Sequence, residues 1–297
     1  MKHKSVFVGL SFAFATFVWA SAVSAGTGPW RFLMQLPAPD AETKIERPVF
    51  SATDSERQRF YVVDSENSRL VSFDREGKFL AAFNAGGRLK KPVAMARDIR
   101  GNIWVVERSV NQLLYVSFKE KQVRNFTLTY PDGGMIFADR PAVDLQGRLF
   151  ILDRLRGAVL QLDDNLQVVK TFAGNTPGFT GFGDYKIKSD GLWALDGLAR
   201  KVYHFDADRA LVKIVQLSPG LEFPVALEID PAGQFYILDR HAGIIAVYDR
   251  EGNFKFDFLE KGKRRGRLWY ASQLLFDWEG RLCVVNEGNG RVDIYSR

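Results

Sequence analysis

Six copies of one short pattern run along the chain, and they constrain its fold more than any other feature. Each copy is an apolar run that ends in an acidic or amide residue, followed by a polar stretch and a second apolar run. The residues that close the first runs are Asp64, Glu107, Asp153, Asp196, Asp239 and Asn286. A repeat of forty-odd residues that holds several short strands is typical of a β-propeller, with one blade per repeat. We therefore expect an all-β, six-bladed propeller of four-stranded antiparallel blades.

A second position of the repeat carries bulky side chains. Three residues before each closing residue stand Tyr61, Trp104, Phe150, Trp193, Tyr236 and Cys283. Large rings at this position would fill the wedge between neighbouring blades, where close packing requires volume. Cys283, the only cysteine, is accordingly predicted to be a small buried hydrophobic residue and not a nucleophile.

Short turns separate the strands within a repeat. An Asp-x-x-Gly sequence precedes four of the first runs, at 98–101, 144–147, 230–233 and 277–280, and a similar one follows the second run at 74–77 and 249–252. Asp opens such a turn through its side chain, and Gly supplies the positive φ that closes it. One blade thus reads as strand, turn, strand, polar loop, strand, turn and outer strand.

Counting strands predicts how the ring closes. The sixth repeat reaches only its third strand before Arg297, while the segment 29–36 (PWRFLMQL) looks like an outer strand without a blade of its own. We expect a strand at about 30–36 to complete the last blade. This pairing would remove two exposed sheet edges that could otherwise aggregate.

Two segments resemble a known repeat family. VDSENSRLVSFDREGKFLAAF (63–83) and YILDRHAGIIAVYDREGNFKFDF (236–258) are similar to the NHL repeat, and the other four copies match it more loosely. The resemblance covers the chain from about residue 30 onward. It implies a six-bladed propeller, here of an exported bacterial type, but a fold does not fix an activity.

The N-terminal segment predicts export. Met1–Lys4 is basic, an apolar stretch runs from Val6 to Ala20, and small residues precede a cleavage position after Ala25. Residues 1–25 are therefore predicted to be a signal peptide, residues 26–297 a single propeller domain, and the protein periplasmic or extracellular without stable membrane insertion. An uncleaved membrane anchor is the alternative. Loss of Lys2 and Lys4 would lower the formal charge from +6 to +4, too little for a nucleic-acid binder.

Few residues suit catalysis. After the predicted leader the histidines are His204, expected to be structural, and His241, expected in an exposed loop. Two histidines are too few for a zinc site, and the sequence departs here from the peptide-amidating lyases, NHL-type propellers that place several histidines around a metal. The predicted inner strands hold one clear acid, Glu228, against Lys186, Lys188 and Arg97, which is a poor cation cage. We expect no metal, no cofactor and no catalytic residues.

The repeated acids are also expected to be structural. A residue that recurs in every repeat suits a task that recurs in every blade, such as binding loop N–H groups. The other role considered is ion pairing with Arg69, Arg108, Arg154 and Arg240.

Departures from the repeat are the better functional candidates. The connection between the fifth and sixth blades contains Lys261, Lys263, Arg264, Arg265, Arg267, Trp269 and Tyr270. The segment 173–185 adds Phe179, Phe182 and Tyr185, and 130–141 is a third insertion. All three connect blades, so they should share one end of the ring with Arg154, Arg156, Arg240 and His241.

Basic residues beside aromatic ones suit an anionic or peptide partner. The sequence therefore favours a non-catalytic scaffold that binds another envelope or extracellular protein, or an anionic polymer. One alternative is a propeller lyase or hydrolase with a site at the channel mouth formed by His241, Glu228 and an arginine. Another is a polysaccharide-binding module that uses Trp269, Tyr270 and the Phe179–Tyr185 loop.

Overall fold

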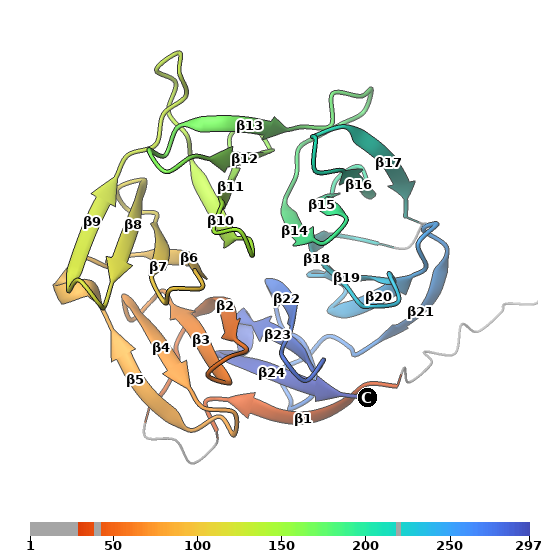
Figure 1. Cartoon of the computed structure of the whole chain (residues 1–297). Coiled ribbons are helices and arrows are strands. Elements are labelled where there is room, and N and C mark those ends of the chain that lie inside the picture. Colours follow the sequence, from red (N-terminus) through yellow and green to blue (C-terminus); the bar gives the residue numbers. More distant parts are fainter. Residues whose placement is uncertain (1–28, 39–42, 218–220) are drawn as a thin grey trace, which may run out of the picture.

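The computed structural model is a ring of six four-stranded antiparallel sheets, which confirms the predicted propeller (Figure 1). It describes residues 29–38, 43–217 and 221–297. Blade 1 consists of β2 (Pro48–Asp54), β3 (Arg59–Asp64), β4 (Arg69–Phe73) and β5 (Phe79–Phe83). Blade 2 consists of β6 (Pro92–Arg97), β7 (Ile103–Glu107), β8 (Gln112–Ser117) and β9 (Gln122–Phe126). Blade 3 consists of β10 (Ala138–Val143), β11 (Leu149–Asp153), β12 (Ala158–Leu162) and β13 (Val168–Phe172).

The remaining three blades repeat this order. Blade 4 consists of β14 (Asp184–Lys188), β15 (Gly191–Asp196), β16 (Lys201–Phe205) and β17 (Leu211–Gln216). Blade 5 consists of β18 (Pro224–Ile229), β19 (Phe235–Asp239), β20 (Ile244–Tyr248) and β21 (Phe254–Phe258). Blade 6 consists of β22 (Gln273–Phe276), β23 (Leu282–Asn286), β24 (Arg291–Ser296) and β1 (Arg31–Leu36). Two single 3-10 turns, η1 (Ala85–Gly87) and η2 (Glu287–Asn289), lie in loops.

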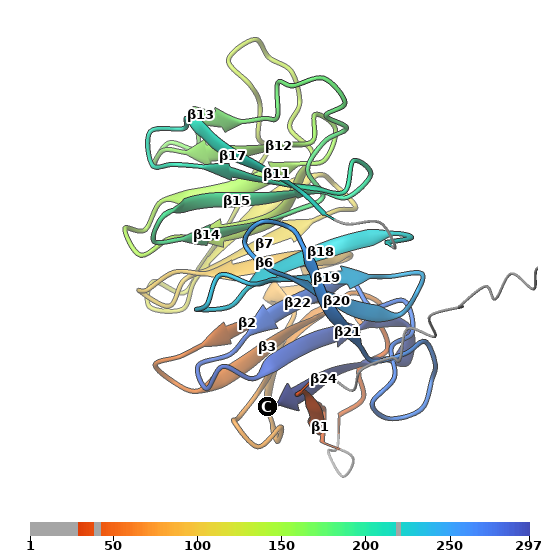
Figure 2. The same ribbon diagram turned by 90° about the vertical axis from the view of Figure 1, so that its right-hand side faces the viewer.

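The ring closes as the strand count predicts. β1 pairs antiparallel with β24, from Arg31 opposite Ser296 to Leu36 opposite Val292, and so forms the outer strand of blade 6. Figure 2 shows the two strands side by side, although they lie at opposite ends of the sequence. Leu36 is fully buried, so β1 contributes to the core as well as to hydrogen bonding.

The bulky position of the repeat packs between blades. Tyr236 of blade 5 meets the rings of Trp30 and Phe276 of blade 6, with ring centres 6.0 and 5.4 Å away. Cys283 is fully buried, and burial raises the pKa of its thiol well above the ordinary value. Both observations agree with the packing role that the sequence predicts for this position.

The repeated acids bind loop backbone, as expected. Asp239, for example, accepts hydrogen bonds from the N–H groups of Phe223 (3.0 Å) and Ala242 (2.9 Å), which belong to two different loops. The predicted ion pairs are correct only for Arg69, whose Nε lies 3.0 Å from Asp64. Arg108 and Arg154 instead pair with Asp139, and Arg240 pairs with Glu287. These arginines lie near the surface of the loops. There they reach the half-buried carboxylates of Asp139 and Glu287 and do not reach the buried repeat acids.

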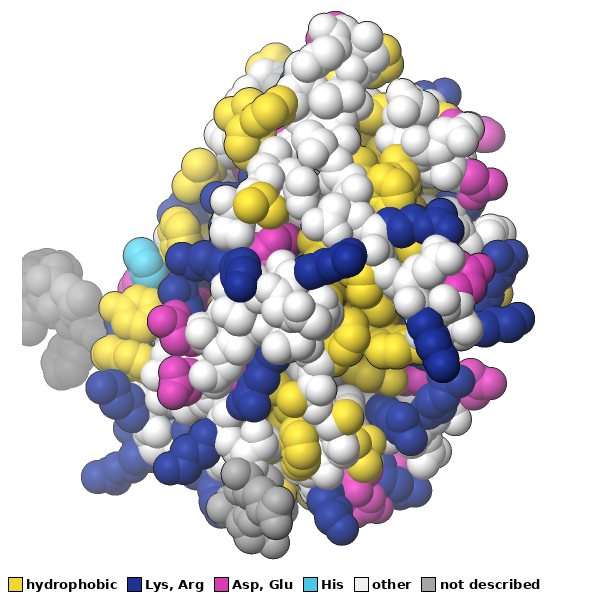
Figure 3. Space-filling model, turned by 90° about the vertical axis from the view of Figure 1, so that its left-hand side faces the viewer, with side chains coloured by type: hydrophobic (Ala, Val, Ile, Leu, Met, Phe, Trp, Pro, Cys, Tyr) yellow, Lys and Arg dark blue, Asp and Glu magenta, His cyan; other side chains and the backbone are white. Residues whose placement is uncertain are grey.

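The ring has two faces that differ in their loops. The loop face carries the connections between blades and the polar loops between second and third strands. The turn face, at the other end of the strands, carries the turns between first and second strands. Figure 3 views the rim around β5, β9 and β13 and shows Lys and Arg interspersed with acidic and hydrophobic side chains.

The predicted leader lies outside the described residues. Within the part of the chain that is described, no helix is long and apolar enough to cross a membrane.

Candidate functional sites

The loop face carries a contiguous patch of cations and rings at blades 5 and 6. We call it the basic–aromatic patch, and its members are Phe223, Arg240, His241, Lys261, Lys263, Trp269 and Tyr270. The rings of His241 and Phe223 stack with centres 4.6 Å apart, and Arg240 lies 5.6 Å from the ring centre of Tyr270. Lys261 and Lys263 lie 5.8 and 5.4 Å from the Trp269 ring centre. Phe223 and Tyr270 remain 39% and 41% exposed, so these two neighbouring rings are accessible to a partner.

The backbone beneath this patch is well connected. Gly262 and Leu268 are bridged by a backbone hydrogen bond of 2.8 Å, so the segment between them projects as a short loop. Asn286, at the end of β23, accepts a hydrogen bond from the N–H of Trp269 (2.8 Å). Arg267 pairs with Glu260 at 2.6 Å, whereas Lys263, Arg264 and Arg265 are exposed and form no ion pair within the described residues. The loop therefore presents three cations from a defined base.

Two of the three aromatic residues in the glycine-rich segment 173–185 are not exposed, contrary to the sequence prediction. Phe182 and Tyr185 are only 4% and 5% exposed, so they lie in the core and do not form a partner surface. Phe179 is half-buried, with its ring 4.9 Å from that of Phe182. Gly181 brings this segment against Gly157, where a side chain on either residue would have little room. The close backbone contact turns the rings inward, against Tyr203.

The remaining predicted partner residues lie on the loop face at blade 3. Arg154 and Arg156 are exposed, and the Arg156 guanidinium stacks 3.6 Å from the Tyr130 ring centre. The predicted residues thus form two groups, one at blades 5 and 6 and one at blade 3.

Charged side chains cross and fill the central channel. Arg140 of β10 reaches the carbonyl oxygens of Val225 (3.4 Å) and Ser272 (3.3 Å) in blades 5 and 6, and it pairs with Asp184. Towards the turn face, Glu228 lies 3.2 Å from Lys186 and 2.8 Å from Lys188. Burial alone would raise the pKa of Glu228, but the two lysines outweigh it and hold the pKa below its ordinary value. Glu228 is therefore a structural anion shared by two cations.

The acid and the base of the enzyme alternative are not brought together. His241 follows Asp239, which lies opposite Pro224 at the loop-face end of β18. Glu228 lies opposite Tyr236, four residues further along the same strand, which is about 13 Å at 3.3 Å per residue. In the described segments, no cluster of three or more His, Cys, Asp or Glu side chains could hold a metal ion.

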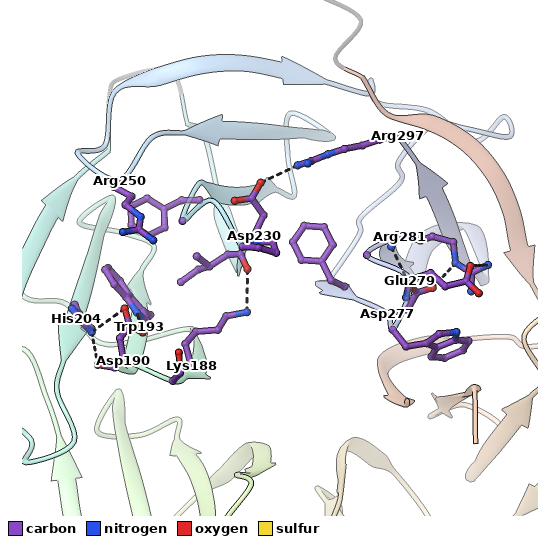
Figure 4. Close-up of a pocket in the computed structure, with 18 of the residues that line it drawn as sticks. Lys188, Asp190, Trp193, His204, Asp230, Arg250, Asp277, Glu279, Arg281 and Arg297 are labelled. Atoms are coloured by element: carbon purple, nitrogen blue, oxygen red, sulfur yellow. Dashed lines mark hydrogen bonds and ion pairs between the residues drawn. The ribbon is translucent and has the colours of Figure 1, made fainter. Parts of the chain in front are cut away.

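The turn face contains a large cavity that the sequence interpretation did not identify. It has a volume of about 1230 Å³ and lies between blades 4, 5 and 6 (Figure 4). A second cavity of about 830 Å³ adjoins it, and both are lined by Lys188 and Ser189. These two residues lie at the inner turn of blade 4, so this turn is the feature that the cavities share.

The inner turn of blade 4 is shorter than those of its neighbours. Two residues, Ser189 and Asp190, separate β14 from β15, whereas five separate the corresponding strands of blades 2, 3, 5 and 6. Gly191, at φ +131°, closes the short turn, and a side chain there would overlap the carbonyl of Phe205. Lys188 pairs with Gly191 in this hairpin, so the hairpin is one residue shorter than its counterparts: four residues lie between the paired Ile187 and Leu192, and five between Ile229 and Phe235 of blade 5.

One wall of the cavity is an aromatic stack. The rings of Trp193 and His204 lie 3.8 Å apart and are tilted by only 5°. Asp190 fixes both, because its carboxylate accepts a hydrogen bond from Trp193 Nε1 (3.1 Å) and its carbonyl oxygen lies 3.0 Å from His204 Nε2. Half-buried Phe276 and Trp278 line the cavity from blade 6. His204 is thus ordered by a neighbouring ring, consistent with its expected structural role.

A sequence signal for this cavity exists. Blade 4 has Ser-Asp-Gly (189–191) where four other repeats have Asp-x-x-Gly. The shortened turn is a departure from the repeat, but it is a deletion, and the insertions attracted the functional interpretation instead.

Comparison of the sequence with protein-family models and with curated proteins gives no match. Comparison with solved structures gives matches that cover most of the chain. A virginiamycin B lyase from Staphylococcus aureus has a TM-score of 0.64 and 11% identity over 90% of this chain and 99% of that one. A streptogramin B lyase has a TM-score of 0.63 and 13% identity over 90% and 97%.

A third similar structure has a different description. An auxiliary nutrient binding protein from Bacteroides thetaiotaomicron has a TM-score of 0.62 and 13% identity over 85% of this chain and 69% of that one. At such low identities the likeness establishes the six-bladed fold. Because the similar structures include lyases and a binding protein, the fold is compatible with either kind of function.

Proposed function

We propose that this protein is an exported NHL-type propeller that acts as a non-catalytic scaffold and binds an acidic surface of another envelope or extracellular protein. The observation that carries the proposal is the basic–aromatic patch, where exposed rings lie beside cations on an ordered base. Aromatic and arginine side chains are the residues most enriched among those that dominate binding energy at protein interfaces. The rigid ring would present them without a large ordering cost.

The channel supports binding over turnover. Its acid is neutralised by two lysines, and Arg140 occupies the space towards the loop face. A general acid or base needs a pKa near the working pH and access to a substrate. The pKa of Glu228 is shifted away from neutral pH, and both of its carboxylate oxygens are taken up by Lys186, Lys188 and the N–H of Ile229. The proposed site therefore lies on the outer surface of the loop face.

The proposal is tested by affinity capture from the native cell envelope with the tagged protein. We expect the wild type to retain a specific protein that is released at high salt, because the contacts are largely ionic. A variant with Lys263, Arg264 and Arg265 changed to Ser should fold but lose that protein. Arg267 is left intact because it pairs with Glu260.

A matched control removes the same charge elsewhere. Arg100, Lys119 and Lys121 are exposed on blade 2, and their change to Ser should leave capture unaffected. Equal loss in both triple variants would overturn the proposal, because it would show a net-charge effect. Capture of a glycan or an anionic polymer in place of a protein would support the polysaccharide or polymer alternatives. Cell fractionation of the full-length chain tests export, and cytoplasmic retention would contradict it.

A further inference from the structure

The turn-face cavity combines an excess of positive charge with aromatic walls. The cations that line it are Lys188, Lys213, Arg250, Arg281 and Arg297, and the carboxylates are Asp190, Asp230, Asp277 and Glu279. Most of these charges are already paired. Arg297 pairs with Asp230 at 2.9 Å, and Arg281 pairs with Asp277 at 2.6 Å, as Figure 4 shows.

The balance of charge differs from one side of the cavity to the other. At blade 6, Arg281 is shared by two carboxylates, Asp277 and Glu279, and at blade 4 the carboxylate of Asp190 lies within ion-pair distance of His204 alone among the described residues.

The cations that lack a close carboxylate lie at blades 4 and 5. Arg250 forms no ion pair within the described residues, and Lys213 has only an exposed carboxylate, Glu251, at 3.8 Å. Lys188 shares the single carboxylate of Glu228 with Lys186, so this group also has one cation in excess. A charge that enters the cavity beside Arg250 is therefore favoured when it is negative.

Arg250 is held over the cavity by its surroundings. It lies across Gly233, where any side chain would overlap its guanidinium group. At the corresponding turn glycines Gly147 and Gly280, no atom lies within 4 Å of the same position. At the third corresponding glycine, Gly101 of blade 2, the guanidinium of Arg97 lies 3.1 Å from this position. Arg250 differs from Arg97 in that it forms no ion pair within the described residues, whereas Arg97 pairs with Asp54. The carbonyl oxygen of Arg250 also accepts a hydrogen bond from Lys213 Nζ (2.8 Å), which holds the lysine ammonium at the same turn.

We propose that this cavity binds an anionic small molecule with a flat aromatic ring. Its carboxylate or similar group would contact Arg250 and Lys213, and its ring would lie against His204, on the side of blade 5 where Trp193 packs against Phe235. Guanidinium groups bind planar oxyanions through paired hydrogen bonds, and rings stack favourably on rings. The cavity volume is sufficient, since pockets that bind drug-sized ligands have volumes of roughly 300–1000 Å³. The site lies on the face opposite the basic–aromatic patch and is independent of the scaffold function.

The experiment is a calorimetric titration of the full-length protein at low salt with 2-naphthoate as the probe. The neutral 2-naphthalenemethanol serves as a comparison of the same shape. We expect saturable binding of the naphthoate. The alcohol should bind more weakly by about tenfold or more, because it lacks one charge-assisted hydrogen bond.

Variants locate the site. Arg250→Gln and Lys213→Gln should each weaken naphthoate binding by about tenfold and leave the alcohol unchanged. Arg75 occupies the same place as Arg250 in the Asp-Arg-Glu-Gly turn of blade 1. Lys170 Nζ bonds the carbonyl oxygen of Ala207 (2.8 Å) as Lys213 bonds that of Arg250. Arg75 pairs with Glu279, which lines the cavity, so the exposed Arg100 of blade 2 serves as the arginine control instead. Arg100→Gln and Lys170→Gln remove equivalent charges away from the cavity and should leave binding intact.

Three results would overturn the proposal. They are the absence of naphthoate binding, equal affinity for the alcohol, and equal weakening by the control variants, which would indicate non-specific attraction to a basic protein. Because Arg250 and Lys213 are exposed, all four variants should unfold at the wild-type temperature. The triple variant of Lys263, Arg264 and Arg265 should bind naphthoate normally, which separates this site from the loop face.

Discussion

At the scale of the residue, Glu228 is the ionised group whose surroundings most depend on it. It is buried, two ammonium groups share its charge, and the N–H of Ile229 donates to it at 3.0 Å. Removing one member of a buried ionic group leaves the others uncompensated and costs about 3–5 kcal/mol. The residue therefore stabilises the inner end of blades 4 and 5.

We predict that Glu228→Gln lowers the free energy of unfolding by about 3–5 kcal/mol at pH 7, measured by urea denaturation. Because the folded pKa of Glu228 lies below its ordinary value of 4.5, its contribution is present above that pH and is lost as the pH falls through the folded pKa. The difference between variant and wild type should therefore shrink in acid. Glu251→Gln removes an exposed acid and should change stability by less than about 0.5 kcal/mol; a comparable loss there would contradict the prediction.

Cys283 gives a second prediction at this scale. Its thiol is fully buried and its pKa is raised by burial, so both access and thiolate formation are suppressed. Iodoacetamide should leave the native protein unmodified for hours at pH 8 and modify it stoichiometrically in urea, as followed by mass spectrometry. Rapid modification without denaturant would show that blade 6 opens locally.

At the scale of the element, the short hairpin of blade 4 depends on one glycine. Gly191 has a φ of +131°, and a Cβ there would overlap the backbone of β16. We predict that Gly191→Ala destabilises the protein by at least about 2 kcal/mol, because strain and steric overlap act together. It should also abolish naphthoate binding. Gly183→Ala is the matched control in the same blade, since no atom lies within 4 Å of its added carbon, and a similar loss there would contradict the argument.

The elements were far easier to predict from the sequence than the site. The repeat period and the turns predicted the blades, and the segment 29–36, which has no blade of its own, predicted how the ring closes. Each of these signals is local or a count of strands. The burial of Phe182 and Tyr185 was not predictable in this way. For Phe182 it follows from the contact between Gly181 and Gly157, which belong to different loops. Tyr185 belongs to β14, where its hydroxyl donates a hydrogen bond to the carbonyl oxygen of Arg140 in blade 3. The cavity was missed for a related reason: the shortened turn is visible in the sequence, but the side chains that surround it come from three blades.

At the scale of the whole molecule, β1 joins the two ends of the sequence into a closed ring. Its pairing with β24 covers the outer edge of blade 6, and Trp30 and Leu36 place buried side chains against that blade. Without β1, the edge of β24 would be open to pairing with another chain. The remaining blades would also lose the packing that links blade 6 to its neighbours.

We predict that a chain beginning at residue 43, which lacks β1, unfolds at a lower temperature and forms oligomers in size-exclusion chromatography with light scattering. A synthetic peptide of residues 29–38 should restore the monomer and raise the unfolding temperature, because it can pair with β24 from outside. Within the peptide, Leu36→Asp should abolish the rescue, since Leu36 is fully buried, whereas Leu33→Asp should preserve it, since Leu33 is 49% exposed. Rescue by both peptides, or by neither, would show that the side-chain packing of β1 does not close the ring.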